Sequence, residues 1–163
     1  SEYIADSGFC NDRSLDSGSD GVSTTANTYF KGYRRYLNHT PSLICPNASN
    51  DLFTVDNTDG NQALTYPIGL ITVDELMLGG LADGYLNRLS YTYSSSNYWT
   101  MSPRFFDATN ASAGVFGASS TGYANYSWVT YTSGVRAVIN LKDDTPITKG
   151  IGTANDPYVV KVA

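Results

Sequence analysis

The sequence has few of the residues that build catalytic centres. Among its 163 residues there are one histidine and two cysteines. The histidine, His39, has no G-x-S-x-G serine to complete a hydrolase triad. No phosphate-binding loop or dinucleotide fingerprint is present, because the glycines lack the required spacing. We therefore expect no enzymatic activity, no catalytic residues and no cofactor.

The chain is also poor in charge. Charged residues make up 15% of it, against about 25% in an average globular protein. Its net charge is −5, its pI is near 4.6, and Arg34-Arg35 is the only adjacent pair of basic residues. Backbone binding to nucleic acid needs clustered Lys and Arg. The composition therefore argues against a nucleic-acid partner.

Long hydrophobic runs are missing as well. The longest, near residues 66–70, is far too short to cross a bilayer, and no basic region followed by an apolar leader opens the chain. We expect attachment to a membrane or pilus only through a segment absent from this chain. The length predicts a single domain over residues 1–163.

The two cysteines, Cys10 and Cys45, favour a disulfide in a lightly charged chain rich in Ser, Thr and Asn. It would close a loop of about 36 residues and contribute roughly 3–4 kcal/mol. Two buried free thiols are the alternative. A metal site is not expected, since the chain lacks a thiolate or imidazole set. The oxygen-rich loop at residues 56–61 favours turn chemistry over calcium, but leaves a structural calcium ion open.

Two helices are predicted, at residues 26–38 and 73–78. Aromatic and apolar residues at positions 29, 30, 33, 36 and 37 form one helical face. Thr72 and Glu75 form a capping box for the second helix, and Gly79-Gly80 ends it. Asp74 stands in its first turn, where an acid stabilises the helix dipole.

The remainder reads as short strands, at residues 66–71, 98–103, 113–118, 134–142 and 158–162, so the predicted class is α+β. Along 134–142, Val135, Ala137, Ile139 and Leu141 alternate onto one face. Arg136 lies on the opposite face, where we expect it to pair with a carboxylate or with carbonyl groups. The expected core contains Ile68, Leu70, Trp99, Met101, Val138 and Leu141.

Residues 91–131 carry the strongest functional signal. The segments 91–99 and 122–131 consist almost entirely of Tyr, Trp, Ser, Thr, Asn, Gly and Ala. This is typical of a recognition surface, in which rigid aromatic rings supply contact area and small polar residues supply hydrogen bonds. The alternative is that Tyr and Thr are simply good strand formers on a half-exposed sheet.

On the first interpretation, the two segments connect strands and share one face with the residues that follow Pro103. The partner would be an unknown protein or glycan. The predicted ligand-binding residues are Tyr91, Tyr93, Asn97, Tyr98, Arg104, Phe105, Phe106, Tyr123, Asn125, Tyr126, Trp128 and Tyr131.

Several phrases of the sequence together resemble a family of bacterial surface domains of unassigned function, common in gut Firmicutes. They occur at residues 9–14, 43–47, 66–72, 74–75, 98–103, 134–142 and 155–160. The W-T-M-S-P and G-V-R-x-V-I-N-L-K phrases are the specific ones. Members are often fused behind a type IV prepilin-like helix or a lipoprotein signal. The resemblance implies an extracellular, cell-surface adhesion or recognition module, or alternatively the globular head of a pilin-like structural subunit.

The aromatic-S-P strand followed by a G-x-R strand also resembles the C-type-lectin-like fold. Its formylglycine-generating-enzyme branch and the variable proteins of diversity-generating retroelements end on a G-F-R strand, where this chain has Val135. The catalytic cysteines of that enzyme have no counterpart here. The resemblance implies two short helices packed on short, twisted antiparallel strands, with a diversified surface over residues 91–131.

Overall fold

The computed structural model describes residues 3–17, 25–82, 84–153 and 155–160. Its centre is a five-stranded antiparallel sheet with the strand order β2-β3-β6-β7-β8. These strands are β2 (Leu15–Ser17), β3 (Thr28–Phe30), β6 (Tyr98–Asp107), β7 (Ser112–Ala118) and β8 (Ala124–Trp128). The described residues thus form an α+β fold, as predicted.

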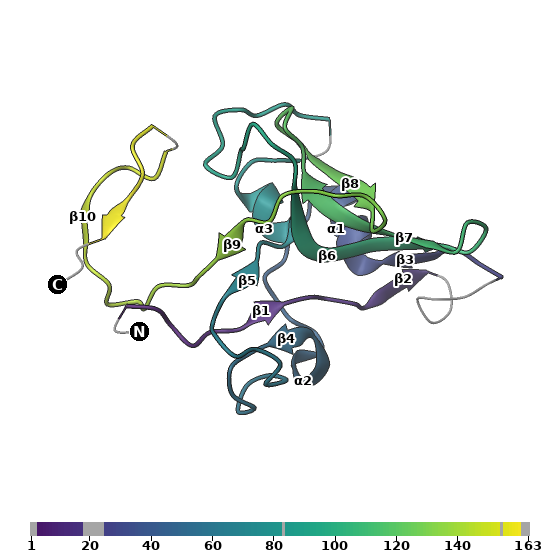
Figure 1. Cartoon of the computed structure of the whole chain (residues 1–163), viewed down its shortest axis with the longest axis horizontal. Helices are drawn as coiled ribbons and strands as arrows, with labels where there is room; N and C mark the ends of the chain where they lie inside the picture. Colours follow the sequence, from purple (N-terminus) through teal and green to yellow (C-terminus); the bar gives the residue numbers. More distant parts are fainter. Residues whose placement is uncertain (1–2, 18–24, 83, 154, 161–163) are drawn as a thin grey trace.

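Three two-stranded antiparallel pairs complete the described strands. β1 (Phe9–Cys10) pairs with β4 (Leu52–Phe53), and β5 (Gly69–Leu70) pairs with β9 (Ala137–Val138). β10 (Ile147–Lys149) pairs with β11 (Val159–Val160), and Figure 1 shows this hairpin apart from the main sheet. Of the strand predicted at 158–162, residues 161–162 lie outside the described residues.

Three short helices are described: α1 (Lys31–Asn38), α2 (Ala48–Asp51) and α3 (Val73–Leu78). The capping box of α3 is confirmed, because the Thr72 hydroxyl accepts from the Glu75 backbone N–H while the Glu75 carboxylate accepts from that of Thr72. α1 starts later than predicted. Residues 28–30 form β3 instead, since pairing with β2 and β6 suits their β-branched and aromatic side chains.

The core lies where α1 and α3 pack on the sheet (Figure 1). Its residues are Tyr36, Val73, Leu76, Met77, Leu81, Tyr98, Phe116, Ala118 and Ala124. The predicted core is wrong for Ile68 and Leu141, which are 46% and 42% exposed. Leu70, Trp99, Met101 and Val138 are only partly buried.

The core prediction failed on β6 because the strand buries the other set of alternate residues. It turns Tyr98, Thr100 and Ser102 inward, so that Trp99 and Met101 lie on the other face. The inward hydroxyls are satisfied: Thr100 donates to the Phe116 carbonyl at 2.8 Å, and Ser102 accepts from the Val73 N–H at 2.9 Å. Apolarity alone therefore misjudged which face is buried.

The alternating segment at 134–142 forms a strand only at β9. Beyond β9 it meets other segments at isolated bridges, Gly134 with Tyr98 and Leu141 with Ile4. Its apolar face is only partly covered, and Val135 and Ile139 are 75% and 44% exposed. The segment at 66–71 is likewise reduced to β5. Conversely, much of 123–131, predicted as a connection, is the edge strand β8.

Candidate recognition surface

A β-bulge in β6 builds the aromatic part of the candidate surface. Pro103 pairs with Val115 and Phe105 with Gly114, so Arg104 is an extra residue without a partner in β7. A bulge re-aims the side chains around it. Here Arg104 and Phe105 both approach the ring of Tyr126 on β8, although they are consecutive in the chain. A regular strand would have placed them on opposite faces.

Aromatic rings from three other elements surround these two side chains. Phe105 meets Tyr126 and Trp128 edge to face, at centroid distances of 5.2 and 5.1 Å. On the other side, Tyr29 stacks on Tyr33 at 5.2 Å. We call this set the Arg104 patch: Tyr29, Tyr33, Arg104, Phe105, Tyr126 and Trp128. All but Phe105 are partly exposed.

The Arg104 guanidinium is held by rings rather than by acceptors. Its central carbon lies 3.9 Å from the ring centre of Tyr126 and 4.5 Å from that of Tyr33. Within the described residues, no carboxylate forms an ion pair with it and no oxygen accepts its N–H groups. A guanidinium carries five donors that all lie in its plane. Stacking therefore orients the group and leaves these donors available.

The other five arginines differ from Arg104 in this respect. Arg13, Arg34 and Arg35 bind carboxylates, and Arg88 donates to the Thr121 carbonyl. Arg136 donates to the carbonyls of Thr92 and Tyr91, at 2.9 and 3.2 Å. That last pairing agrees with the expectation that Arg136 would meet carbonyl groups.

The predicted residues at the start of the segment lie elsewhere. Tyr91 and Tyr93 line a hollow of about 460 Å³ together with Arg136 and Tyr158. The Tyr93 hydroxyl donates to the Ser120 carbonyl, so it helps to fix its loop to the β7–β8 turn. Asn97 has the same role, because its side-chain oxygen accepts from the Ser120 N–H at 2.7 Å. These polar groups are used in holding the loop.

Tyr98 belongs to the core rather than to a surface. It is buried, its hydroxyl donates to the Thr92 carbonyl, and burial raises its pKa despite the nearby Arg136. Alternation along β6 places Phe106 on the face opposite Phe105. The predicted single surface is therefore wrong for these two residues.

The last predicted residues lie along β8 and beyond. Asn125 donates to the Tyr123 hydroxyl at 3.3 Å and, with Asn97, lines a small hollow of about 50 Å³. Tyr131 is exposed beyond the end of β8. Of the twelve predicted residues, the Arg104 patch thus contains Arg104, Phe105, Tyr126 and Trp128. Sequence reasoning missed its other two members, Tyr29 and Tyr33, because they were assigned to one face of the first predicted helix.

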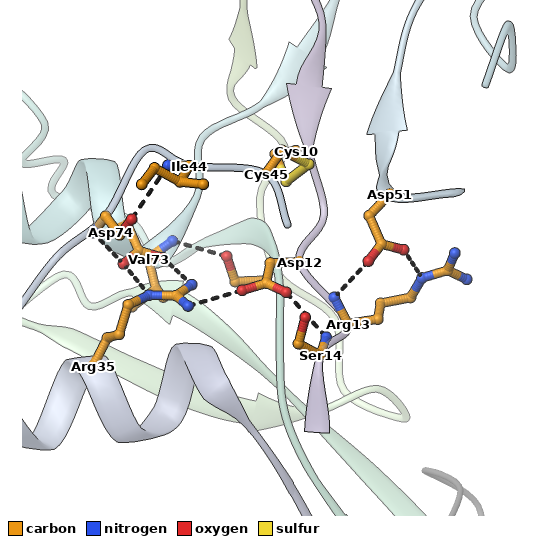
Figure 2. Close-up of polar contacts among 12 residues, drawn as sticks. Cys10, Asp12, Arg13, Ser14, Arg35, Ile44, Cys45, Asp51, Val73 and Asp74 are labelled. Carbon is orange, nitrogen blue, oxygen red and sulfur yellow. Dashed lines mark hydrogen bonds and ion pairs between the residues drawn. A yellow bond between two sulfur atoms is a disulfide. The ribbon is translucent and has the colours of Figure 1, made fainter. Parts of the chain in front are cut away.

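A second polar cluster, which the sequence did not predict, is centred on Arg35 of α1 (Figure 2). Arg35 of α1 binds both oxygens of Asp74 at 2.7 and 2.8 Å, and Asp12 at 2.8 Å. Asp74 thus does more than stabilise the dipole of α3. The three side chains come from the segment after β1, from α1 and from α3, so the cluster ties these elements together.

The protonation of this cluster is set by its bonds. Burial alone would raise the pKa of Asp12, but hydrogen bonds from Ser14 and Arg35 outweigh it and the pKa is lowered. Hydrogen bonding to Asp74 raises the pKa of Arg35, against the effect of burial. A cavity of about 210 Å³ adjoins the cluster. Since these side chains already bind one another, we regard the cluster as structural.

The predicted disulfide is confirmed. Cys10 and Cys45 are joined, and the bond lies beside the Arg35 cluster (Figure 2). At the oxygen-rich loop, Asp56 accepts from the Thr58 N–H, as turn chemistry predicts. In the part of the chain that the structure describes, no group of three or more His, Cys, Asp or Glu could hold a metal ion, and no helix is long and apolar enough to cross a membrane.

Comparison with known proteins finds no matching family model, no matching curated protein and no matching solved structure.

Proposed function

We propose that this chain is an extracellular ligand-binding domain and that the Arg104 patch is its recognition surface. One observation carries the proposal: a partly exposed guanidinium is stacked on Tyr33 and Tyr126 with no acceptor among the described residues. Arg, Tyr and Trp are the residues that most often dominate binding energy at interfaces. A group that is already ordered by stacking loses little conformational entropy when a ligand binds.

The scaffold and the disulfide are consistent with this proposal. The rings come from β3, α1, β6 and β8, so recognition would rest on regular elements of the scaffold. The disulfide suits an oxidising, extracellular compartment. A C-type-lectin-like architecture stays part of the proposal, supported by the α+β class and by the W-T-M-S-P and G-V-R phrases.

The test is a binding screen of the intact protein against glycans and host surface proteins. Tyr126→Ala and Trp128→Ala should each lower the affinity for a detected ligand by about tenfold or more, the range of interface hot spots. Tyr131→Ala is the matched control, because Tyr131 is an exposed aromatic outside the patch. Equal effects of all three substitutions, or none, would refute the assignment of the surface.

One observation favours the pilin-like alternative. Apolar side chains are exposed along the C-terminal third of the described chain: Val135, Ile139, Leu141, Ile147, Ile151 and Val159. Such surface is costly in water and often marks a contact with other protein. Concentration-dependent assembly that Val135→Ser abolishes, while Trp128→Ala leaves it intact, would favour the structural role over ligand binding.

A further inference from the structure

The unused donors of Arg104 point to a particular kind of ligand, and the inference rests on the proposed function of the patch. We propose that the Arg104 patch binds the carboxylate of an acidic sugar, with the sugar ring packed against Tyr126 or Trp128. Neither the composition nor the resemblance of the sequence assigns this chemistry.

The geometry of the cation favours a carboxylate. The ring centres of Tyr126 and Tyr33 lie 3.9 and 4.5 Å from its central carbon, and its five N–H donors, which share one plane, have no acceptor among the described residues. A planar fork of N–H donors matches a carboxylate, which accepts two parallel hydrogen bonds. A neutral hydroxyl would use only part of this set and would gain no charge assistance.

The chemistry around the cation favours a sugar ring that carries a single charge. Tyr33, Tyr126 and Trp128 are partly exposed rings, and their negative faces attract the weakly positive C–H groups of a sugar ring. Arg104 is the only cation within the patch. One carboxylate attached to one ring therefore fits it better than a densely charged chain does. The net charge of −5 also opposes partners such as polyglutamate or nucleic acid.

The patch is already ordered in the free protein. The bulge at Pro103–Phe105 fixes the direction of Arg104, and Phe105 is buried beneath it against Tyr126 and Trp128. Gly114 faces Phe105 so closely that a Cβ there would lie 2.6 Å from the ring. The position of the donor thus depends on packing that already exists in the free protein.

The experiment uses one sugar with and without its charge. Methyl galacturonoside and its methyl ester differ only in whether the single carboxylate is free. Calorimetry should show the free acid binding about ten- to a hundredfold more tightly, the range expected for a charge-assisted hydrogen bond. Added salt should lower the affinity for the free acid and leave the affinity for the ester unchanged.

Substitutions at Arg104 test whether its charge causes the preference, and a control shows whether the fold is intact. Arg104→Gln should abolish the preference for the acid, and Arg104→Lys should keep only part of it, because a lysine lacks the planar fork. Arg88→Gln removes the same charge from an exposed arginine outside the patch, which donates to the Thr121 carbonyl, and should leave the preference unchanged. Near-identical circular dichroism spectra would show that each variant is folded.

Three results would overturn the inference: equal affinity for acid and ester, a preference that survives Arg104→Gln, or a hexaglutamate peptide that binds as tightly as the acid. The failure of the broader proposal looks different. If both sugars bind equally and Trp128→Ala weakens both, the patch is a recognition surface and only the carboxylate assignment falls. If neither sugar binds, the acidic-sugar assignment falls, and the ligand screen alone decides the function of the patch.

Discussion

Replacing Arg35 with Met should destabilise the protein more than replacing an exposed arginine does. Arg35 has a side chain that is only 17% exposed, and its two partners, Asp12 and Asp74, are 8% and 5% exposed. Methionine retains the apolar stem but leaves two nearly buried carboxylates without a cation. Breaking a buried ion pair in this way typically costs about 3–5 kcal/mol.

The neighbouring arginine is the matched control. Arg34 has a 57% exposed side chain and pairs with Asp16 at 2.9 Å. An exposed pair of this kind contributes only about 0–1 kcal/mol. Arg34→Met therefore removes the same charge, from the same helix, at little expected cost. For a chain of this length, the loss at Arg35 corresponds to a fall in Tm of roughly 6–20 °C.

Urea unfolding under non-reducing conditions measures both variants while the disulfide stays intact. A cycle with Asp74→Asn should give a coupling of about 1–3 kcal/mol, because the two groups share two hydrogen bonds. If Arg35→Met and Arg34→Met lose the same free energy of unfolding, or if the coupling is near zero, then the cluster does not hold the three elements together.

Three further predictions concern the surroundings of this cluster and the patch. Reducing the Cys10–Cys45 bond, which spans 35 positions, should lower the free energy of unfolding by about 3–4 kcal/mol; identical urea curves with and without reductant would contradict this. Because the folded pKa of Asp12 lies below 3.8, its contribution is complete above about pH 4 and is lost as the pH falls through the folded value. Asp12→Asn should therefore reduce the loss of unfolding free energy as the pH falls below about 4. An unchanged loss would show that Asp12 does not cause it. Gly114→Ala should cost about 1–3 kcal/mol by crowding Phe105, and a near-neutral effect on Tm would show that the ring has room to move.

Some features were determined by local sequence. The capping box of α3 could be predicted because Thr72 and Glu75 satisfy each other's backbone N–H groups within one turn. The strand β7 and the disulfide followed from equally direct signals, a strand-forming run and a single pair of cysteines. The α+β class could be derived from the order of such segments. In each case the residues that interact are either close in the chain or, like the two cysteines, have no alternative partner.

The core and the candidate surface were decided by contacts between distant segments. Nothing local shows that Thr100 and Ser102 turn inward, because their hydroxyls are satisfied by Phe116 and Val73 from other elements. The pairing of Arg35 with Asp12 likewise joins residues 23 positions apart.

The Arg104 patch has the same origin. Its aromatic composition was visible in the sequence, but its membership depends on a bulge that turns Arg104 toward Tyr126, and on the placement of Tyr33 by α1. The bulge arises from the register between β6 and β7, which is set by the pairing of whole strands. Composition therefore indicated which residue types could recognise a ligand, whereas register and packing decided which side chains meet.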